Sequence, residues 1–191
     1  MMFSRMAVFV IGVPLLGLIT SFRYVKSRKS IKNFFSKREL LGNMMYVYLL
    51  CVVALTIFPL NINLTRPSNL EPGINVIPVF NTLKDMSLIS DSTMKSYMLR
   101  FWIKNIVGNL ILLMPLGVIA PILWKRFRNV KSILLLCFCT TLTIECLQYI
   151  SSFLGNRRSF DVDDLILNTL GGLIGYFIIK GVNPYGLLSY K

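Results

Sequence analysis

Apolar residues gather in five long runs along the chain, and polar residues collect between them. The runs lie near residues 3–22, 42–60, 105–124, 132–150 and 164–180. A helix needs about 20 mostly apolar residues to cross a hydrocarbon core of about 30 Å, and each run meets or approaches that length. The pattern therefore predicts an all-α, polytopic helical membrane protein with about five transmembrane helices.

Positive charge is concentrated in two of the connections between these runs. The chain carries 21 Lys and Arg against 8 Asp and Glu, a net charge of +13, and the basic residues crowd 23–38 and 125–131. Six of the acids lie instead in 61–104 and 151–164. Because basic loops stay in the cytoplasm, we expect the N-terminus outside, the C-terminus inside and the acidic connections outside. Membrane topology thus explains the charge better than nucleic-acid binding does, and membrane lipids are the expected partners.

A removable signal peptide is the competing account of residues 1–22, because Arg5 precedes an apolar run. The main basic cluster follows this run, however, and no small-x-small cleavage site lies between Thr20 and Lys26. We therefore expect a retained first helix.

The four cysteines all lie inside predicted spans, where a thiol behaves as a small hydrophobic group. Cys139 and Cys146 share a helix face, but one helix cannot fold back to join them. The chain has no histidine, and the paired spacing of metal ligands is missing. We expect packing roles for Cys51, Cys137, Cys139 and Cys146, with no metal and no cofactor.

Three of the predicted helices carry polar residues at helical spacing near the same end. Thr141, Glu145, Gln148 and Ser152 recur at intervals of four, three and four, which places them on one face. Glu145 is expected about 7–8 Å below the outer boundary, at about 1.5 Å per residue, and Asn168 about 6 Å below it. We expect an outward-facing polar pocket with the following wall: Asn105, Asn109, Glu145, Gln148, Asp164 and Asn168.

A hydrogen-bond network that only fixes packing is the alternative reading of these residues. Interhelical hydrogen bonds in membranes average about 0.6 kcal/mol, whereas a carboxylate in mid-helix costs about 2.5–3.5 kcal/mol on insertion scales. This imbalance favours a functional role for Glu145. The small-residue stripe of Gly171, Gly172 and Gly175 more often serves close helix packing.

The connection at 156–164 combines three acids with two arginines, Arg157 and Arg158. Either Asp161 or Asp163 is expected to cap the following helix. Arginine suits bidentate binding of phosphate or carboxylate, so this connection also suits an anionic lipid or a peptide terminus.

Four short blocks together resemble the VanZ-like family of bacterial membrane proteins. NVIPVF at 75–80 is similar to the family's N-x-x-P-F segment, with Val79 inserted, and NIVGNLILLMPLG at 105–117 is similar to its asparagine-rich helix with a proline–glycine break. Glu145 and Gln148 form its E-x-x-Q pair. The signature R-x-x-D-x-x-D-x-x-x-N-x-x-G is matched by Arg158, Asp161, Asp164, Asn168 and Gly171.

The resemblance implies a multi-pass protein of the bacterial plasma membrane. For founding members of the family it also implies low-level resistance to teicoplanin-type glycopeptide antibiotics. It covers roughly 42–180, leaving an N-terminal helix and basic loop at 1–41 and a cytoplasmic tail at 181–191. The expected ligand-binding residues are Asn105, Asn109, Glu145, Gln148, Arg158, Asp161, Asp164 and Asn168.

Three functions fit this site to different degrees. The favoured one is a non-enzymatic binder or modulator at the outer leaflet, whose ligand is the drug, a lipid-linked cell-wall precursor or a cell-wall protein. A membrane enzyme would use Glu145 as general base and the loop acids as Mg²⁺ ligands, but no nucleophile–base pair is evident. A transporter would need polar residues across the bilayer, and these stop below Asn109, Thr141 and Asn168. Only an oligomer could then complete an aqueous path.

Overall fold

The computed structural model describes residues 2–26, 36–62, 73–75, 92–156 and 158–182. Arg157, residues 76–80 of the first family-like block and residues 183–191 of the expected tail lie outside the described residues. The helices and the 3-10 turn η1 run as follows: α1 (Met6–Lys26), α3 (Lys37–Thr56), α5 (Ser92–Leu112), α6 (Met114–Leu123), η1 (Lys125–Arg128), α7 (Val130–Phe153) and α8 (Val162–Val182). Four two-residue strands complete the described fold: β1 (Met2–Phe3), β2 (Leu60–Asn61), β3 (Ile74–Asn75) and β4 (Phe160–Asp161).

Five candidate spans within the described residues are long and apolar enough to cross a membrane. They are Met6–Val25, Lys37–Thr56, Met94–Leu123, Val130–Phe153 and Val162–Val182. The prediction of an all-α, five-helix membrane protein is therefore confirmed.

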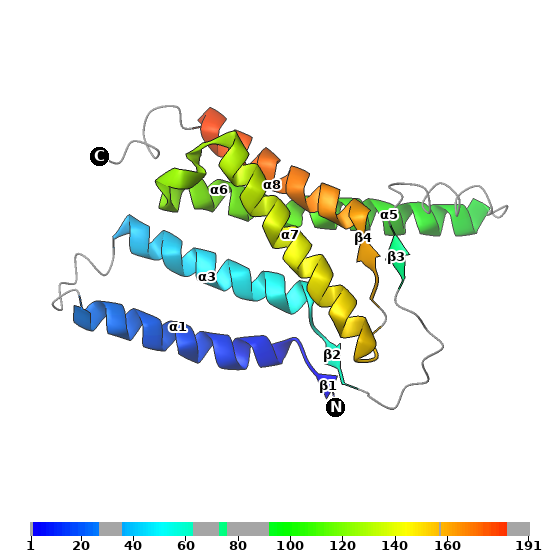
Figure 1. Ribbon diagram of the computed structural model, residues 1–191, viewed down its shortest axis with the longest axis horizontal. Helices are drawn as coiled ribbons and strands as arrows, with labels where there is room; N and C mark the ends of the chain where they lie inside the picture. The colour runs from blue at the N-terminus through cyan, green and yellow to red at the C-terminus, as the bar shows by residue number, and fades with distance from the viewer. Residues whose placement is uncertain (1, 27–35, 63–72, 76–91, 157, 183–191) are drawn as a thin grey trace.

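The described connections that the charge pattern assigns to opposite sides of the membrane lie at opposite ends of the bundle. All four short strands, the end of α7 and the start of α8 lie at one end, which we call the strand end (Figure 1). The end of α1, the start of α3 and the η1 turn lie at the opposite end, which we call the basic end (Figure 1). Which end faces the outside of the cell stays a prediction.

The third span begins much earlier than the expected residue 105. Residues 92–104 contain no proline or glycine, so α5 continues through them without a break. The combined span of 30 residues corresponds to about 45 Å at about 1.5 Å per residue, longer than a hydrocarbon core of about 30 Å. The expected break does occur: α5 ends at Leu112, and Pro115 stands in the first turn of α6.

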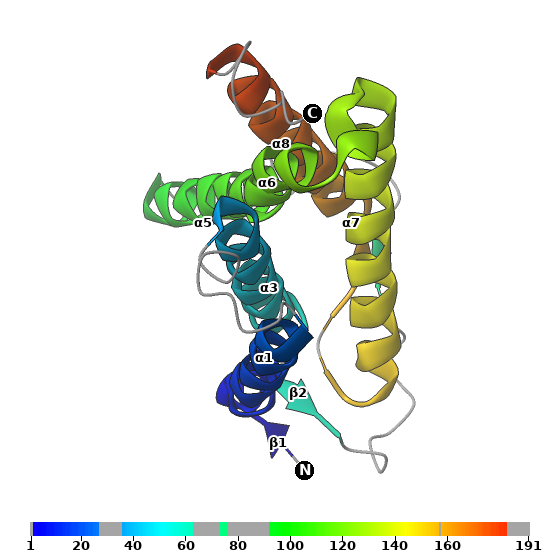
Figure 2. The ribbon, with the colours of Figure 1, turned by 90° about the vertical axis from the view of Figure 1, so that its left-hand side faces the viewer.

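Glycines bring α8 into close contact with the broken helix α5–α6. A Cβ added at Gly171 would collide with the carbonyl of Leu110, and one at Gly175 with the carbonyl of Met114. On α6, a Cβ at Gly117 would collide with the carbonyl of Gly172. The small-residue stripe is thus a packing surface, as expected. Through this surface α8 packs against α5 and α6, and it also packs against α7 (Figures 1 and 2).

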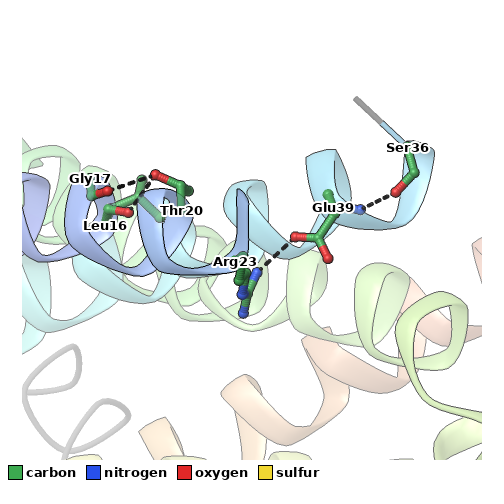
Figure 3. A network of polar contacts seen from close by, with 6 residues as sticks. All are labelled: Leu16, Gly17, Thr20, Arg23, Ser36 and Glu39. Atoms are coloured by element: carbon green, nitrogen blue, oxygen red, sulfur yellow. Dashed lines mark hydrogen bonds and ion pairs between the residues drawn. The ribbon is translucent and has the colours of Figure 1, made fainter. Parts of the chain in front are cut away.

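The first helix packs on α3, at the side of the bundle remote from α8 (Figure 2). The Tyr46 hydroxyl donates to the carbonyl of Gly12 at 3.1 Å. At the basic end, the Arg23 guanidinium donates to the Glu39 carboxylate at 3.0 Å, and the Ser36 hydroxyl accepts from the Glu39 N–H (Figure 3). The Tyr46 and Arg23 contacts hold α1 against α3 at two separate places.

One asparagine fastens the strand end together. Asn156 follows Gly155, whose φ of 98° suits a residue without a side chain. The Asn156 side chain accepts from the Asn61 N–H at 2.8 Å and donates to the Asn61 carbonyl at 3.0 Å. It also donates to the carbonyl of Ser151 at 2.9 Å. Asn156 thereby joins β2 to the turn after α7, and β2 pairs in turn with β1.

Candidate functional site

A buried carboxylate on α7 supports the beginning of α8. Glu145 is only 1% exposed, and its Oε2 accepts a hydrogen bond from the main-chain N–H of Asp161 at 3.0 Å. Because α7 continues to Phe153, Glu145 lies about 12 Å from the end of its helix at about 1.5 Å per residue. The helix therefore continues farther beyond Glu145 than the 7–8 Å expected from the sequence.

Asp161 collects contacts from three segments. Its Oδ1 accepts from the Asp163 N–H at 2.9 Å, which makes Asp161 the capping residue of α8 and confirms the expectation of an acid cap. The same oxygen accepts from Asn75 Nδ2 at 3.0 Å. Asn75 is held opposite Asp161 because β3 and β4 pair in parallel register. Asp161 therefore links α8, β3 and, through its own N–H, α7.

Two asparagines of α5 bind the carboxylate of Asp164. Asn109 donates to Asp164 Oδ1, and Asn105, one turn away, also hydrogen-bonds to this carboxylate. Asp164 and Asn109 are half-buried, whereas Asn105 is exposed. The predicted contact between the asparagine-rich helix and the last helix is thus present, and Asn105 forms its exposed side.

Arg158 is the basic member of the site. The side chain is half-buried and lies close enough to Glu145 for their charges to interact. Burial lowers the pKa of the Arg158 guanidinium from its usual range; the nearby Arg5 lowers it further, and Glu145 opposes the shift. An arginine remains protonated at neutral pH in spite of such a shift, so Arg158 supplies a positive charge.

Asn168 lies deeper than these residues and is 1% exposed. Its Nδ2 donates to the Thr141 hydroxyl at 3.2 Å, which joins α8 to α7. Among the described residues, its Oδ1 has no hydrogen-bond partner. An unpaired buried amide oxygen costs free energy. This unsatisfied acceptor lies on the buried side of the site.

Gln148 does not join these residues by a hydrogen bond. Its Nε2 donates to the main-chain carbonyl of Thr56 at 2.9 Å, at the end of α3. The expected wall therefore divides into two parts. Gln148 fixes α7 to α3, while the other expected residues lie around the start of α8.

Two contributors, Asn75 and Arg5, were not predicted from the sequence. Asn75 stood in a family-like block without a role, and its proximity to Asp161 depends on strand pairing across the molecule. Arg5 acts on Arg158 from the N-terminal segment, and nothing in the local sequence connects them. We call the following residues the polar cluster: Asn75, Asn105, Asn109, Glu145, Arg158, Asp161 and Asp164.

The polar cluster offers acidic and amide groups around one guanidinium. Charge interactions connect the carboxylates of Glu145, Asp161 and Asp164. In the part of the chain that the structure describes, no three Asp, Glu, Cys or His residues are arranged to hold a metal ion. The arrangement suits binding of a ligand that carries both cationic and anionic groups.

Comparison with known proteins identifies one family. The family model described as VanZ/LLP1 matches residues 45–183, which include every member of the polar cluster. Searches of the curated proteins and of the solved structures found no match.

Proposed function

Because the chain belongs to the VanZ/LLP1 family, we propose that it gives a bacterium low-level protection against teicoplanin-type glycopeptide antibiotics. The protein would reside in the plasma membrane with the strand end outside, as its charge segregation favours. There the polar cluster would bind the drug, a lipid-linked cell-wall precursor or another component of the envelope.

The observation that carries this proposal is the buried carboxylate of Glu145, which makes a hydrogen bond but costs free energy to bury. Its hydrogen bond to the Asp161 N–H belongs to a class worth about 1.5–3 kcal/mol when one partner is charged. Burial of the charge in a helix costs about 2.5–3.5 kcal/mol on insertion scales, and two further carboxylates repel it. An amide would make the same hydrogen bond without the charge. A negative charge at this position therefore serves something other than packing.

The exposure of the side chains divides the polar cluster into two layers. Asn105 is exposed and Arg158, Asp161 and Asp164 are half-buried, so these groups are accessible to a ligand. Asp161 and Asp164 would contact cationic groups, and Arg158 would hold a phosphate or carboxylate. Glu145 is a positioning residue, since it holds the main chain of Asp161 and its negative charge acts on the Arg158 guanidinium.

The same geometry favours binding over catalysis. A general base has to reach the proton that it removes, but Glu145 is 1% exposed and occupied by the Asp161 N–H. The Oδ1 atom of Asp161 is likewise occupied, by Asn75 Nδ2 and by the Asp163 N–H. The alternative function, an enzyme acting on a lipid-linked precursor or peptide, would require these bonds to break first.

The test is the teicoplanin susceptibility of a bacterial host with and without the protein. We expect wild type to raise the inhibitory concentration, and Arg158→Ala and Asp164→Asn to abolish the rise at equal membrane levels. Glu39→Gln is the matched control, because it removes a carboxylate at the basic end. No protection by wild type would refute the proposed resistance role, and full protection by both site variants would refute the proposed site.

A further inference from the structure

A cavity of about 690 Å³ lies at the basic end, far from the polar cluster. It opens between the start of α3 and the junction of α6 with η1. Its volume falls within the range of about 300–1,000 Å³ that is usual for ligand sites. The proposed function assigns no role to it.

The charged residues around this cavity are all cations. They come from two separate segments: Lys37 and Arg38 from α3, and Lys125, Arg126 and Arg128 from η1. No acidic residue lines the cavity among the described residues. The neighbouring Glu39 is bound by Arg23 of α1 and so does not neutralise them.

Two of these arginines are held in place by the fold. The Arg126 guanidinium lies over the Phe127 ring, 4.4 Å from its centroid, and Phe127 is buried. Arg128 Nε donates to the Pro121 carbonyl at 3.2 Å, which leaves its terminal nitrogens for other acceptors. The first turn of α3 adds its positive dipole end. An anion entering the cavity would meet prearranged donors.

The other part of the lining is apolar. Leu41, Ile122, Leu123 and Trp124 contribute it, and Trp124 is 44% exposed. The candidate spans that contain α3 and α6 end at Lys37 and Leu123, so the cavity lies at the level where the hydrocarbon core would meet the headgroups. Tryptophan is enriched at this level of membrane proteins. The cavity thus joins an anion-binding rim to a surface that suits a hydrocarbon chain.

We propose that this cavity binds one anionic phospholipid. Its phosphate would lie among Lys37, Arg38 and Arg126, and an acyl chain would run along Leu41 and Trp124 toward the membrane. The apolar lining favours a lipid over free phosphate, which would use only the cations. Basic pockets between membrane helices bind anionic lipid headgroups in this manner.

The test uses Trp124 as its own reporter. The chain contains two tryptophans, so Trp102→Phe leaves Trp124 alone. The full-length protein is reconstituted in vesicles of phosphatidylcholine and phosphatidylglycerol, with bromine on the acyl chains of one lipid or the other at equal bromine content. We expect at least about twofold stronger quenching of Trp124 when the anionic lipid carries the bromine. Equal quenching by the two lipids would overturn the proposal.

Variants then separate the cavity from general surface attraction. Lys37→Gln, Arg38→Gln and Arg126→Gln together are expected to remove the preference; all three side chains are exposed, so folding should survive, which circular dichroism checks. Lys131→Gln with Lys180→Gln removes exposed cations at the same end but outside the cavity, and should keep the preference. The proposal would be overturned if the triple variant kept the preference for the anionic lipid, or if the double variant lost it.

A final arm distinguishes the lipid from a small anion. Inorganic phosphate is added to the wild-type vesicles, with chloride at the same ionic strength as the reference. The preference for the brominated anionic lipid should be the same in both salts. Its selective loss in phosphate would mean that the cavity is a small-anion site, against the proposal.

Discussion

The carboxylate of Glu145 accepts a hydrogen bond from the main-chain N–H of Asp161 at 3.0 Å. This contact joins a residue buried deep in α7 to the strand that leads into α8. The side chain of Asp161 caps α8 and receives Asn75. A change at Glu145 is therefore transmitted to the accessible part of the polar cluster through the main chain of Asp161.

Glu145→Gln is expected to separate stability from function. The glutamine oxygen still accepts from the Asp161 N–H, while the buried charge and its repulsion with Asp161 and Asp164 disappear. We expect the free energy of unfolding to stay level or rise by about 0.5–2 kcal/mol, as when a functional site is relieved of a costly group. Thermal unfolding of the purified protein in detergent measures this.

The same variant should lose protection against teicoplanin at unchanged membrane levels, because Arg158 loses the negative charge that acts on its guanidinium. A fall in the unfolding midpoint, accompanied by reduced membrane levels, would show that the carboxylate stabilises the fold. Its assignment as a functional charge would then be wrong.

Asn156→Ala should loosen the strand end. The substitution removes the side chain that pairs with both the N–H and the carbonyl of Asn61. A main-chain group left unpaired costs about 1–3 kcal/mol, and we expect a loss of stability of that size. Ser159→Ala is the control, because Ser159 is exposed on the same connection and should change stability by less than about 0.5 kcal/mol. Equal midpoints for the two variants would contradict the role of Asn156.

Two glycine substitutions should have opposite effects on stability. Gly171→Ala places a Cβ against the Leu110 carbonyl, so α8 has to move from α5, at a cost of about 1–3 kcal/mol. Gly108→Ala places its Cβ where no atom lies within 4 Å, and should stabilise by about 0.4–1 kcal/mol. The unfolding midpoints of both variants test the packing of α8. Destabilisation by Gly108→Ala, or none by Gly171→Ala, would contradict the described helix contact.

The orientation of the bundle is open to a labelling test. In a variant without the four native cysteines, Ser159→Cys reports on the strand end and Lys131→Cys on the basic end; both positions are exposed. We expect a membrane-impermeant maleimide to label Ser159→Cys in intact cells and Lys131→Cys only after permeabilisation. The reverse pattern would place the polar cluster inside and refute a role at the outer leaflet.

Periodicity was sufficient to predict the helices and the contact between the asparagine-rich helix and the last helix. Asn109 and Asp164 stand at helical spacing on long apolar runs, and the structure brings them into contact. The glycine stripe likewise implied close packing of the last helix. These features depend on local sequence, and the structure confirms the helices and the close packing.

The contacts that cross the molecule could not be predicted in the same way. Asn75 meets Asp161 because two short strands pair, and such pairing depends on the path of the connecting chain. Gln148 shares a face with Glu145 in sequence, but the neighbouring end of α3 offers the Thr56 carbonyl and binds its amide. The early start of α5 was missed because Lys95, Arg100 and Lys104 interrupt its hydrophobic pattern.

Binding to the purified protein tests the central claim, that the polar cluster is a ligand site, most directly. The full chain in nanodiscs is titrated with teicoplanin and with a lipid-linked cell-wall precursor, as wild type and as Asp164→Asn. We expect wild type to bind at least one of them and Asp164→Asn to bind it at least about tenfold more weakly, or about 1.4 kcal/mol. Failure of wild type to bind either, or equal affinity of the variant, would contradict the claim.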